Sequence, residues 1–443
     1  MKRAFDVIVI GAGASGLAAA KELEHNGIES VCILEGSDRV GGRIKTIDTP
    51  SGGFIDIGAQ WIHGQKDNYL HDFAAPLGLV GERVSVDGEG DFYTDKHELL
   101  NESLVSEVLG VLSSFKKDAE NISGSDNAIP ESMGHYLKER FNDYLYPLVN
   151  RTPKEKKIME AIFHWDNRWV RIDNACDSLN NLSVTRWGDF LPCKGHYNMN
   201  PNINYCKELV ETPSGHYKRH DGSYPVFLKC KNGRVYECNH VIVTCSLGYL
   251  KKNKDSLFHP RLPPTVDKAI ENVGFGVIDK IFLEFEKPFW GPDFTGCHLV
   301  WTGNEIPDFN RNKPDTKLIN GNVLHDKCVF LLRKFTGQNI PEPIRIFRSK
   351  WGTDELFLGS YSHRSISSDP SEKEGDPIQI LNQPIYAKVN TKQRFPIVVF
   401  AGEANSAKYF STVHGALSNG RSQASHYINR MKNTESMSLT SKL

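Results

Sequence analysis

The sequence predicts an α/β protein that contains a Rossmann-type dinucleotide-binding domain and a second domain. A short apolar run of Val and Ile over 7–10 is typical of a strand buried on both faces of a parallel sheet. Three glycines with G-x-G-x-x-G spacing follow at once, and a helical segment then extends from Leu17 to about Asn26. A second apolar run over 30–34 is typical of the next strand. Because 443 residues are too many for one hydrophobic core, we expect two domains.

The glycine turn is predicted to bind the phosphates of a dinucleotide. Gly11 permits the tight turn, Gly13 lets a pyrophosphate approach the backbone, and Gly16 lets the helix pack close to the strand. The helix start around Ala14 offers free N–H groups and a positive dipole end. Glu35 ends the second strand about 20 residues past the turn, where its carboxylate can accept from ribose hydroxyls. A purely structural glycine turn, the alternative reading, would not explain Glu35.

Composition and charge exclude several classes of protein. The 53 Lys and Arg residues nearly balance the 54 Asp and Glu residues, which argues against a general nucleic-acid binder. No apolar run reaches the length of a membrane span. The N-terminus resembles a signal peptide, but Asp6 interrupts its apolar run and the glycine turn explains the region better. The nine cysteines form no C-x-x-C pair. This pattern favours a reducing compartment and argues against a zinc site or a disulfide framework in the protein.

A second glycine motif distinguishes this chain from nicotinamide-binding proteins. Gly42 and Arg43 follow Gly41, and adjacent glycines beside an arginine suit a backbone that lies against more phosphate, with a bidentate cation next to it. The stretch 53–64 follows and contains Gln60, Trp61 and His63. With these motifs the chain resembles the flavin-containing amine oxidase family, in the branch of spermine and peroxisomal acetylpolyamine oxidases. The resemblance implies an FAD enzyme in which Gly42, Arg43, Gln60 and Trp61 contact the cofactor.

The resemblance also implies that an FAD-binding domain and an α+β substrate-binding domain of mixed sheet and helices alternate along the chain. The expected FAD-binding segments are 1–66, 193–260 and 390–430, the expected substrate-binding segments are 67–192 and 261–389, and a tail covers 431–443. Helical periodicity over 69–79, 101–120, 131–141 and 154–166 fits the substrate-binding domain.

Two segments depart from the family pattern. Over 193–224 we find neither the helix nor the strand that relatives carry near the adenine, so the middle FAD-binding segment is shortened. Over 301–326 relatives have more strand sequence, whereas this chain has a polar loop. The pattern resumes with a hairpin over 226–238 and a buried strand that begins at Val241.

The last block of motifs, near the C-terminal end of the chain, is predicted to complete the cofactor site. A buried strand over 397–400 leads through Ala401 and Gly402 into Glu403, so that a carboxylate can meet the hydroxyls of the cofactor. A helix start with small residues follows, where the backbone N–H groups of Thr412 and Val413 can lie against the flavin carbonyls. A surface position for Glu403 is hard to reconcile with the apolar residues that precede it.

The resemblance assigns candidate roles to residues around the substrate. Lys280 matches the lysine that points at flavin N5 through a water molecule, and His63 matches a histidine that faces the substrate. Tyr361 is the candidate aromatic wall for the amine. Asp173 and Asp279 are candidate carboxylates for a distal substrate nitrogen, although charged surface residues are the alternative for both. From the residues alone, a core histidine that donates one hydrogen bond is the favoured reading of His63, and the resemblance reverses it.

The expected reaction is the oxidation of a polyamine by dioxygen through FAD, with hydrogen peroxide as a product. Because no cysteine follows Cys328, the FAD is expected to be non-covalently bound, unlike that of the monoamine oxidases. Two alternatives remain: a catalytically impaired flavin-fold protein with weak or no FAD binding, and a lysine demethylase-like amine oxidase. The second lacks support, since the chain offers no room for the helical module and insertion that those enzymes carry.

The tripeptide Ser441-Lys442-Leu443 is typical of a peroxisomal address at a free C-terminus, which an import receptor reads. A solvated tail in the cytoplasm is the alternative. A peroxide-producing enzyme in the peroxisome is self-consistent, because the product is made where it can be destroyed.

Overall fold

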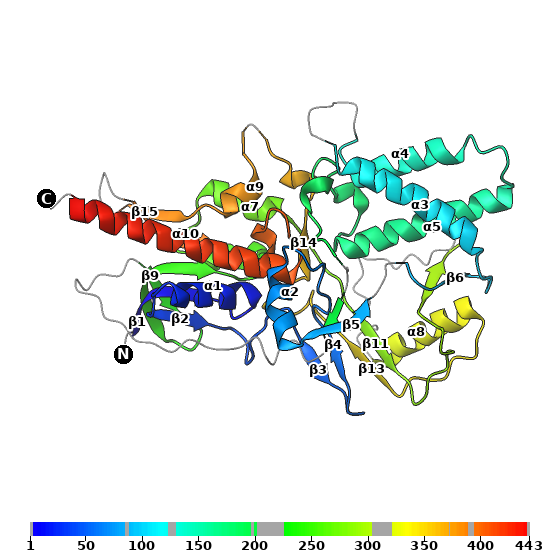
Figure 1. Cartoon of the computed structure of the whole chain (residues 1–443), viewed down its shortest axis with the longest axis horizontal. Helices are drawn as coiled ribbons and strands as arrows, with labels where there is room; N and C mark the ends of the chain where they lie inside the picture. The colour runs from blue at the N-terminus through cyan, green and yellow to red at the C-terminus, as the bar shows by residue number, and fades with distance from the viewer. Residues whose placement is uncertain are drawn as a thin grey trace. The chain divides into compact units, whose positions relative to one another are not determined.

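A computed structural model of the chain describes residues 3–84, 88–122, 130–195, 199–201, 226–303, 321–371, 373–388 and 394–440. It divides into two compact units, each formed from separate stretches of the chain (Figure 1). Unit 1 comprises Met1–Val84, Asp189–Ile278 and Lys350–Leu443, and unit 2 comprises Ser85–Gly188 and Asp279–Ser349.

A six-stranded sheet forms the centre of unit 1. Its strands are β1 (Arg3–Ile10), β2 (Val31–Leu34), β8 (Val226–Lys229), β9 (Val235–Val243), β15 (Ile385–Lys388) and β16 (Arg394–Phe400). The order is β15-β16-β9-β1-β2, and β8 pairs with the first half of β9. The inner pairs β16–β9, β9–β1 and β1–β2 are parallel, whereas β15–β16 and β8–β9 are antiparallel.

Helices cover both faces of this sheet, which explains why residues 7–10 of β1 are all apolar. Val7 and Val9 of β1 pack with α1 (Ala14–His25) and α10 (Val413–Thr440), which run together along one face (Figure 1). Ile8 points to the other face, in a core with α6 (Leu247–Leu257), α7 (Pro264–Asn272) and α9 (Pro377–Leu381). Unit 1 is therefore an α/β sheet with helices packed on both faces, as expected.

Shorter elements complete unit 1. They are β3 (Thr46–Asp48) with β4 (Phe54–Asp56), β5 (Val80–Val84) with β7 (Met199–Pro201), β10 (Gly274–Gly276) with β14 (Tyr361–His363), helix α2 (Tyr69–Ala74), and the 3-10 helices η1 (Ala75–Leu77), η5 (Ile366–Ser368) and η6 (Glu403–Asn405).

Three helices supply most of the core of unit 2. They are α3 (Glu102–Ala119), α4 (Met133–Leu145) and α5 (Pro153–Asp173), and they bury a shared cluster that includes Leu112, Leu137 and Ile162. Two strand pairs and a fourth helix complete the unit: β6 (Asp91–Thr94) with β12 (Cys297–Val300), β11 (Ile281–Glu284) with β13 (Arg345–Arg348), and α8 (Gly321–Thr336). A 3-10 helix, η2 (Leu179–Asn181), lies beside α4.

The boundaries of the two units differ from those expected from the resemblance. Residues 67–84 and 261–278 belong to unit 1, as do 350–389. The reason is strand and helix pairing: β10 pairs with β14, and α7 packs on α9. A polar loop was expected over 301–326, but residues 321–326 form the beginning of helix α8. Most of segment 193–224 lies outside the described residues. No helix within the described ranges is long and apolar enough to cross a membrane.

A buried histidine in the central sheet makes the stability of unit 1 depend on pH. His240 on β9 is fully buried, with Nδ1 3.0 Å from the carbonyl oxygen of Pro396 and its ring stacked on Tyr427. Burial lowers the pKa of His240 to about 4. The unfolded chain therefore binds a proton at higher pH than the folded chain, and stability is lost as the pH falls from 6.5 towards 4.

We expect His240 to account for about 1.4 kcal/mol of lost unfolding free energy between pH 7.5 and pH 5.5. His240→Phe retains a ring against Tyr427 and removes this part of the pH dependence. The measurement is urea unfolding of both proteins at the two pH values. His426→Gln is the matched control, since His426 is exposed on α10. An unchanged pH dependence in His240→Phe would contradict the assignment.

Candidate active site

The first part of the site is the turn between β1 and α1. Gly11 has a φ of 105°, a left-handed conformation that favours glycine. A Cβ on Gly16 would overlap the carbonyl oxygen of Gly11, so the close packing of α1 on the turn requires glycine there. Gly13 is the N-cap of α1 and no side chain caps the helix, so the first N–H groups of α1, from Ala14 onward, are not used by a capping side chain. Such a helix start suits a phosphate.

Glu35 lies at the end of β2, next to this turn. Its Oε2 accepts from the backbone N–H of Ala12 at 2.7 Å, and its Oε1 accepts from the backbone N–H of Ser37 at 2.8 Å. These bonds hold the half-buried carboxylate at the carboxyl edge of the parallel strands, where ligands of open α/β sheets bind. The position is the one that a ribose-binding carboxylate requires.

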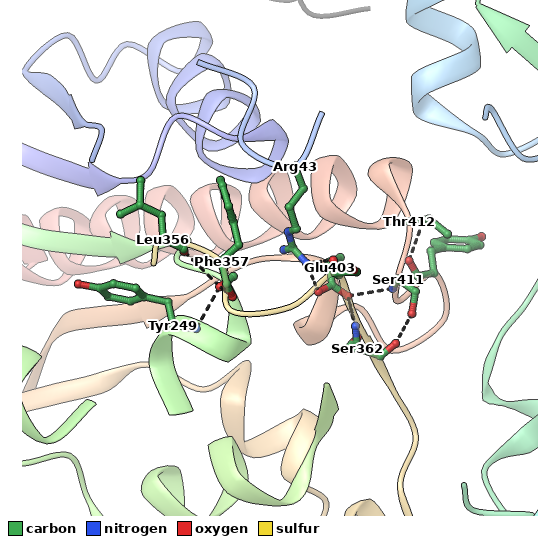
Figure 2. Close-up of polar contacts among 11 residues, drawn as sticks. Arg43, Tyr249, Leu356, Phe357, Ser362, Glu403, Ser411 and Thr412 are labelled. Atoms are coloured by element: carbon green, nitrogen blue, oxygen red, sulfur yellow. Dashed lines mark hydrogen bonds and ion pairs between the residues drawn. The ribbon is translucent and has the colours of Figure 1, made fainter. Parts of the chain in front are cut away.

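A buried carboxylate forms the second part of the site (Figure 2). Glu403 is 5% exposed, and its Oε1 forms an ion pair with Arg43 at 2.8 Å. Its Oε2 accepts from Ser362 Oγ at 2.6 Å and from the backbone N–H of Ser411 at 3.0 Å. Arg43 also donates to the carbonyl oxygen of Ser360 at 2.8 Å. The carboxylate thus joins three stretches that are far apart in sequence, around residues 43, 360–362 and 403–411.

The beginning of α10 lies against this cluster. Ser411 has a φ of 67°, unusual for a non-glycine residue, and its hydroxyl donates to the carbonyl oxygen of Ser362. Thr412 Oγ1 donates to the carbonyl oxygen of Tyr409 at 2.7 Å and accepts from the backbone N–H of Gly415 at 3.0 Å. The Thr412 side chain is therefore used to cap α10. Thr412 and Val413 would contact a cofactor through their backbone groups.

A small cavity of about 10 Å³ lies beside the Arg43–Glu403 pair at the carboxyl ends of β9 and β16. Its lining includes Arg43, Val243, Cys245, Gly402 and Glu403. Burial raises the pKa of the Cys245 thiol to about 12, with a smaller contribution from the charge of Glu35. Cys245 therefore stays protonated and serves as a small apolar wall.

The Trp61-Ile62-His63-Gly64 turn is also in unit 1, and Asn68 fixes its shape. The fully buried Asn68 donates from Nδ2 to the carbonyl oxygens of His63 and Gly64 at 2.9 and 3.0 Å, and it caps α2 through Oδ1. Trp61, His63 and the neighbouring Gln60 are half-buried. The buried His414 of α10 has a pKa of about 4, lowered mainly by burial and further by the charge of His63.

Tyr361 opens β14 and is half-buried, with its backbone paired to Gly276. The other predicted substrate residues are in unit 2. Lys280 immediately precedes β11 and is half-buried, and its backbone N–H donates to Ser349 Oγ at 2.8 Å. The same hydroxyl donates to Asp279 Oδ1 at 2.7 Å, and Asp279 is exposed. Asp173 is the last residue of α5 and is also exposed.

Unit 1 thus brings together the glycine turn, Glu35, Arg43 and Glu403, and it also holds Tyr361 and the turn that contains His63. Lys280 and Asp279 lie in unit 2 and are connected through Ser349, and Asp173 lies in the same unit at the end of α5.

Sequence reasoning missed three residues that hold this site together. They are Asn68, Ser349 and Ser246, of which Ser246 caps α6 and donates to the carbonyl oxygen of Phe357 at 2.6 Å. Figure 2 shows Phe357 and Tyr249 beside this contact. Asn68 precedes a helical run as an N-cap residue should, so that part of its role was detectable. The tertiary contacts of Ser246 and Ser349 carry no local signal.

The residues of unit 1 fit a flavin dinucleotide. The uncapped helix start and the close glycine packing leave a backbone surface for a pyrophosphate, and Glu35 offers acceptor oxygens for a ribose. Arg43 and Glu403 supply a second charged contact beside the cavity. Fold and site together therefore define a dinucleotide-binding flavoprotein of the α/β class.

Comparison with known proteins identifies the family. The family model "Flavin containing amine oxidoreductase" matches residues 14–198 and 216–427, so the chain belongs to the flavin-containing amine oxidoreductases, which are FAD enzymes. The peroxisomal N(1)-acetyl-spermine/spermidine oxidases of Bos taurus and Homo sapiens are each 28% identical to it. The matches cover 94% of this chain and 93% of the bovine protein, and 95% and 94% for the human one.

A solved structure of a redesigned putrescine oxidase has the same fold. It superposes with a TM-score of 0.64 at 17% sequence identity and covers 97% of this chain and 100% of its own. The α/β FAD-binding fold expected from the sequence is confirmed.

Gly16→Ala tests the cofactor site. The added Cβ would overlap the Gly11 carbonyl oxygen and push α1 away from the turn, so we expect the purified protein to lose most of its FAD. The measurement is the flavin absorbance per mole of protein. Gly110→Ala is the matched control, because a Cβ at that exposed position of α3 meets nothing within 4 Å. Full FAD content in Gly16→Ala would refute the placement.

Proposed function

We propose that this enzyme oxidises polyamines, spermine or acetylated polyamines, with FAD and dioxygen to an imine, which water hydrolyses to an aldehyde and a shortened amine, and that the dioxygen is reduced to hydrogen peroxide. The observation that carries the proposal is the match to the acetyl-spermine/spermidine oxidases over almost the whole of both chains. The Trp61-Ile62-His63-Gly64 turn, typical of that branch, supports it. Bound FAD would supply the two-electron oxidation of the carbon next to the amine nitrogen and return the electrons to dioxygen.

The proposed roles of the chain's own residues follow from their environment. The glycine turn, Ala14, Glu35, Gly42, Arg43, Gln60, Trp61, Glu403, Thr412 and Val413 would hold the cofactor. His63, held by Asn68, would distinguish neutral from protonated amines, since imidazole titrates near neutral pH. Tyr361 would orient the amine through its aromatic face. Lys280, fixed through Ser349, would hold a water at the reacting end, while Asp173 and Asp279 remain candidate partners of distal substrate nitrogens.

We also propose that the FAD is non-covalent. The monoamine oxidases attach FAD to a cysteine near the position of Gly359-Ser360-Tyr361, and the sequence has no cysteine after Cys328. Flavin should therefore leave with the supernatant when the protein is denatured and precipitated.

The function is tested by measuring peroxide with spermine, N1-acetylspermine, spermidine and a monoamine. We expect a yellow protein that forms peroxide with at least one polyamine and does not form it with the monoamine. Lys280→Met should keep its FAD and lower turnover by about 10²-fold, because the lysine would no longer hold the water. Lys287→Met is the control, since Lys287 is an exposed lysine in the same unit. A colourless and inert wild-type protein would favour a flavin-fold binder instead.

We propose the peroxisome as the compartment, because the two mammalian relatives carry that name and the peroxide product suits it. The tripeptide Ser441-Lys442-Leu443 lies outside the described residues and is the address that an import receptor would read. A fluorescent fusion that leaves this end free should enter peroxisomes, and removal of the three residues should leave it in the cytoplasm. Import without them would refute the address.

A further inference from the structure

One face of helix α5 in unit 2 carries a row of polar side chains. His164, Asn167, Arg168 and Arg171 have i, i+3, i+4 and i+7 spacing, which places them on the same side of the helix. The opposite side of α5 supplies the buried Met159, Ile162 and Val170 to the core of the unit. We call the four polar residues the α5 cation row.

The α5 cation row contains buried polar atoms that lack hydrogen-bond partners. Two of these atoms are donors, Arg168 Nη2 and Arg171 Nε, and the third, Asn167 Oδ1, is an acceptor. All three are inaccessible to water, and no group of the described chain bonds to them. A buried donor without an acceptor is costly, and a charged one more so. Native proteins almost always satisfy such groups, so these donors indicate an acceptor that the described residues do not supply.

Other arginines of unit 2 show the difference. Arg140 pairs with Asp118, and Arg151 pairs with Glu107 and Glu155. The carboxylate nearest in sequence to Arg168 is Asp166. Its Oδ1 is held by Lys116 at 2.8 Å, and its Oδ2 is buried and bonds to no group of the described chain, so it does not pair with Arg168. The two guanidinium groups of the α5 cation row therefore lack the carboxylate that their neighbours have among the described residues.

The electrostatic surroundings of the row are positive. Burial lowers the pKa of Arg168, and no acidic group offsets the effect. Burial also lowers the pKa of His164, and the charges of Arg168 and Lys138 lower it further, while Glu160 opposes them. Cations from α4 and α5 thus dominate the potential here, and an anion would be attracted.

We propose that the α5 cation row is a binding site for a small oxyanion, a carboxylate or a phosphate, held by Arg168 and Arg171. The two guanidinium groups are on adjacent turns, about 5–6 Å apart at Cβ, and each presents a planar fork that suits carboxylate and phosphate oxygens. The site is separate from the cofactor residues of unit 1 and does not depend on the proposed oxidation of polyamines. A ligand of this kind would carry the opposite charge to a polyamine.

The experiment is calorimetric titration of the FAD-loaded full-length enzyme with phosphate and, separately, with citrate, at constant ionic strength in chloride buffer. We expect saturable binding of at least one of the two anions. Arg168→Met should weaken that binding by about tenfold or more, and Arg168→Lys by less, because lysine keeps the charge but not the fork. Lys157→Met is the matched control, an exposed lysine on the same helix, and should bind like the wild type.

If Arg168→Met does not fold, Arg171→Met replaces it with the same expected loss. Absence of saturable binding to both anions in the wild type would overturn the proposal. Equal affinities in the wild type, Arg168→Met and Arg171→Met would overturn it as well. Amine oxidation is measured in parallel, so that a failure of this site is distinguished from a failure of the proposed function.

Discussion

The ion pair between Arg43 and Glu403 is the interaction on which the cofactor side of this protein depends. It connects the second glycine motif to the end of β16, and the serines at 360, 362 and 411 bring two more segments to the same point. A carboxylate that is 5% exposed is tolerated only when its oxygens are satisfied, and here Arg43, Ser362 and Ser411 all bond to it. Folding of unit 1 therefore assembles the site as a whole.

The sheet explains why the cofactor residues can be so far apart in sequence. Parallel strands place all their carboxyl ends at one edge, and β1, β2, β9 and β16 all take part in parallel pairs. Each strand that ends there delivers its own group: the glycine turn after β1, Glu35 after β2, Cys245 after β9 and Glu403 after β16. Unit 2 is inserted between these strands in sequence without interrupting the sheet.

Much of this arrangement could be predicted from sequence because its signals are local. The glycine spacing, Glu35 and the apolar run before Glu403 each indicate the end of a strand that is followed by a group able to bind a ligand. The extent of unit 1 could not be predicted, since the pairing of β10 with β14 joins segments whose own patterns are weak. Likewise, β9 is one strand of nine residues, although the hairpin signal and the buried run suggest two elements. Tertiary hydrogen bonds from Ser246 and Ser349 leave no trace in local periodicity.

Helix α10 has a geometric consequence of its own. It begins at Val413, beside the flavin-site residues, and continues for 28 residues to Thr440. At 1.5 Å per residue, a helix of that length spans about 42 Å. Its far end therefore lies well away from Thr412 and Val413 at its beginning. A protein that binds the chain beyond that end would not contact the residues at the beginning of the helix, so handling of the folded enzyme need not disturb the Glu403 cluster.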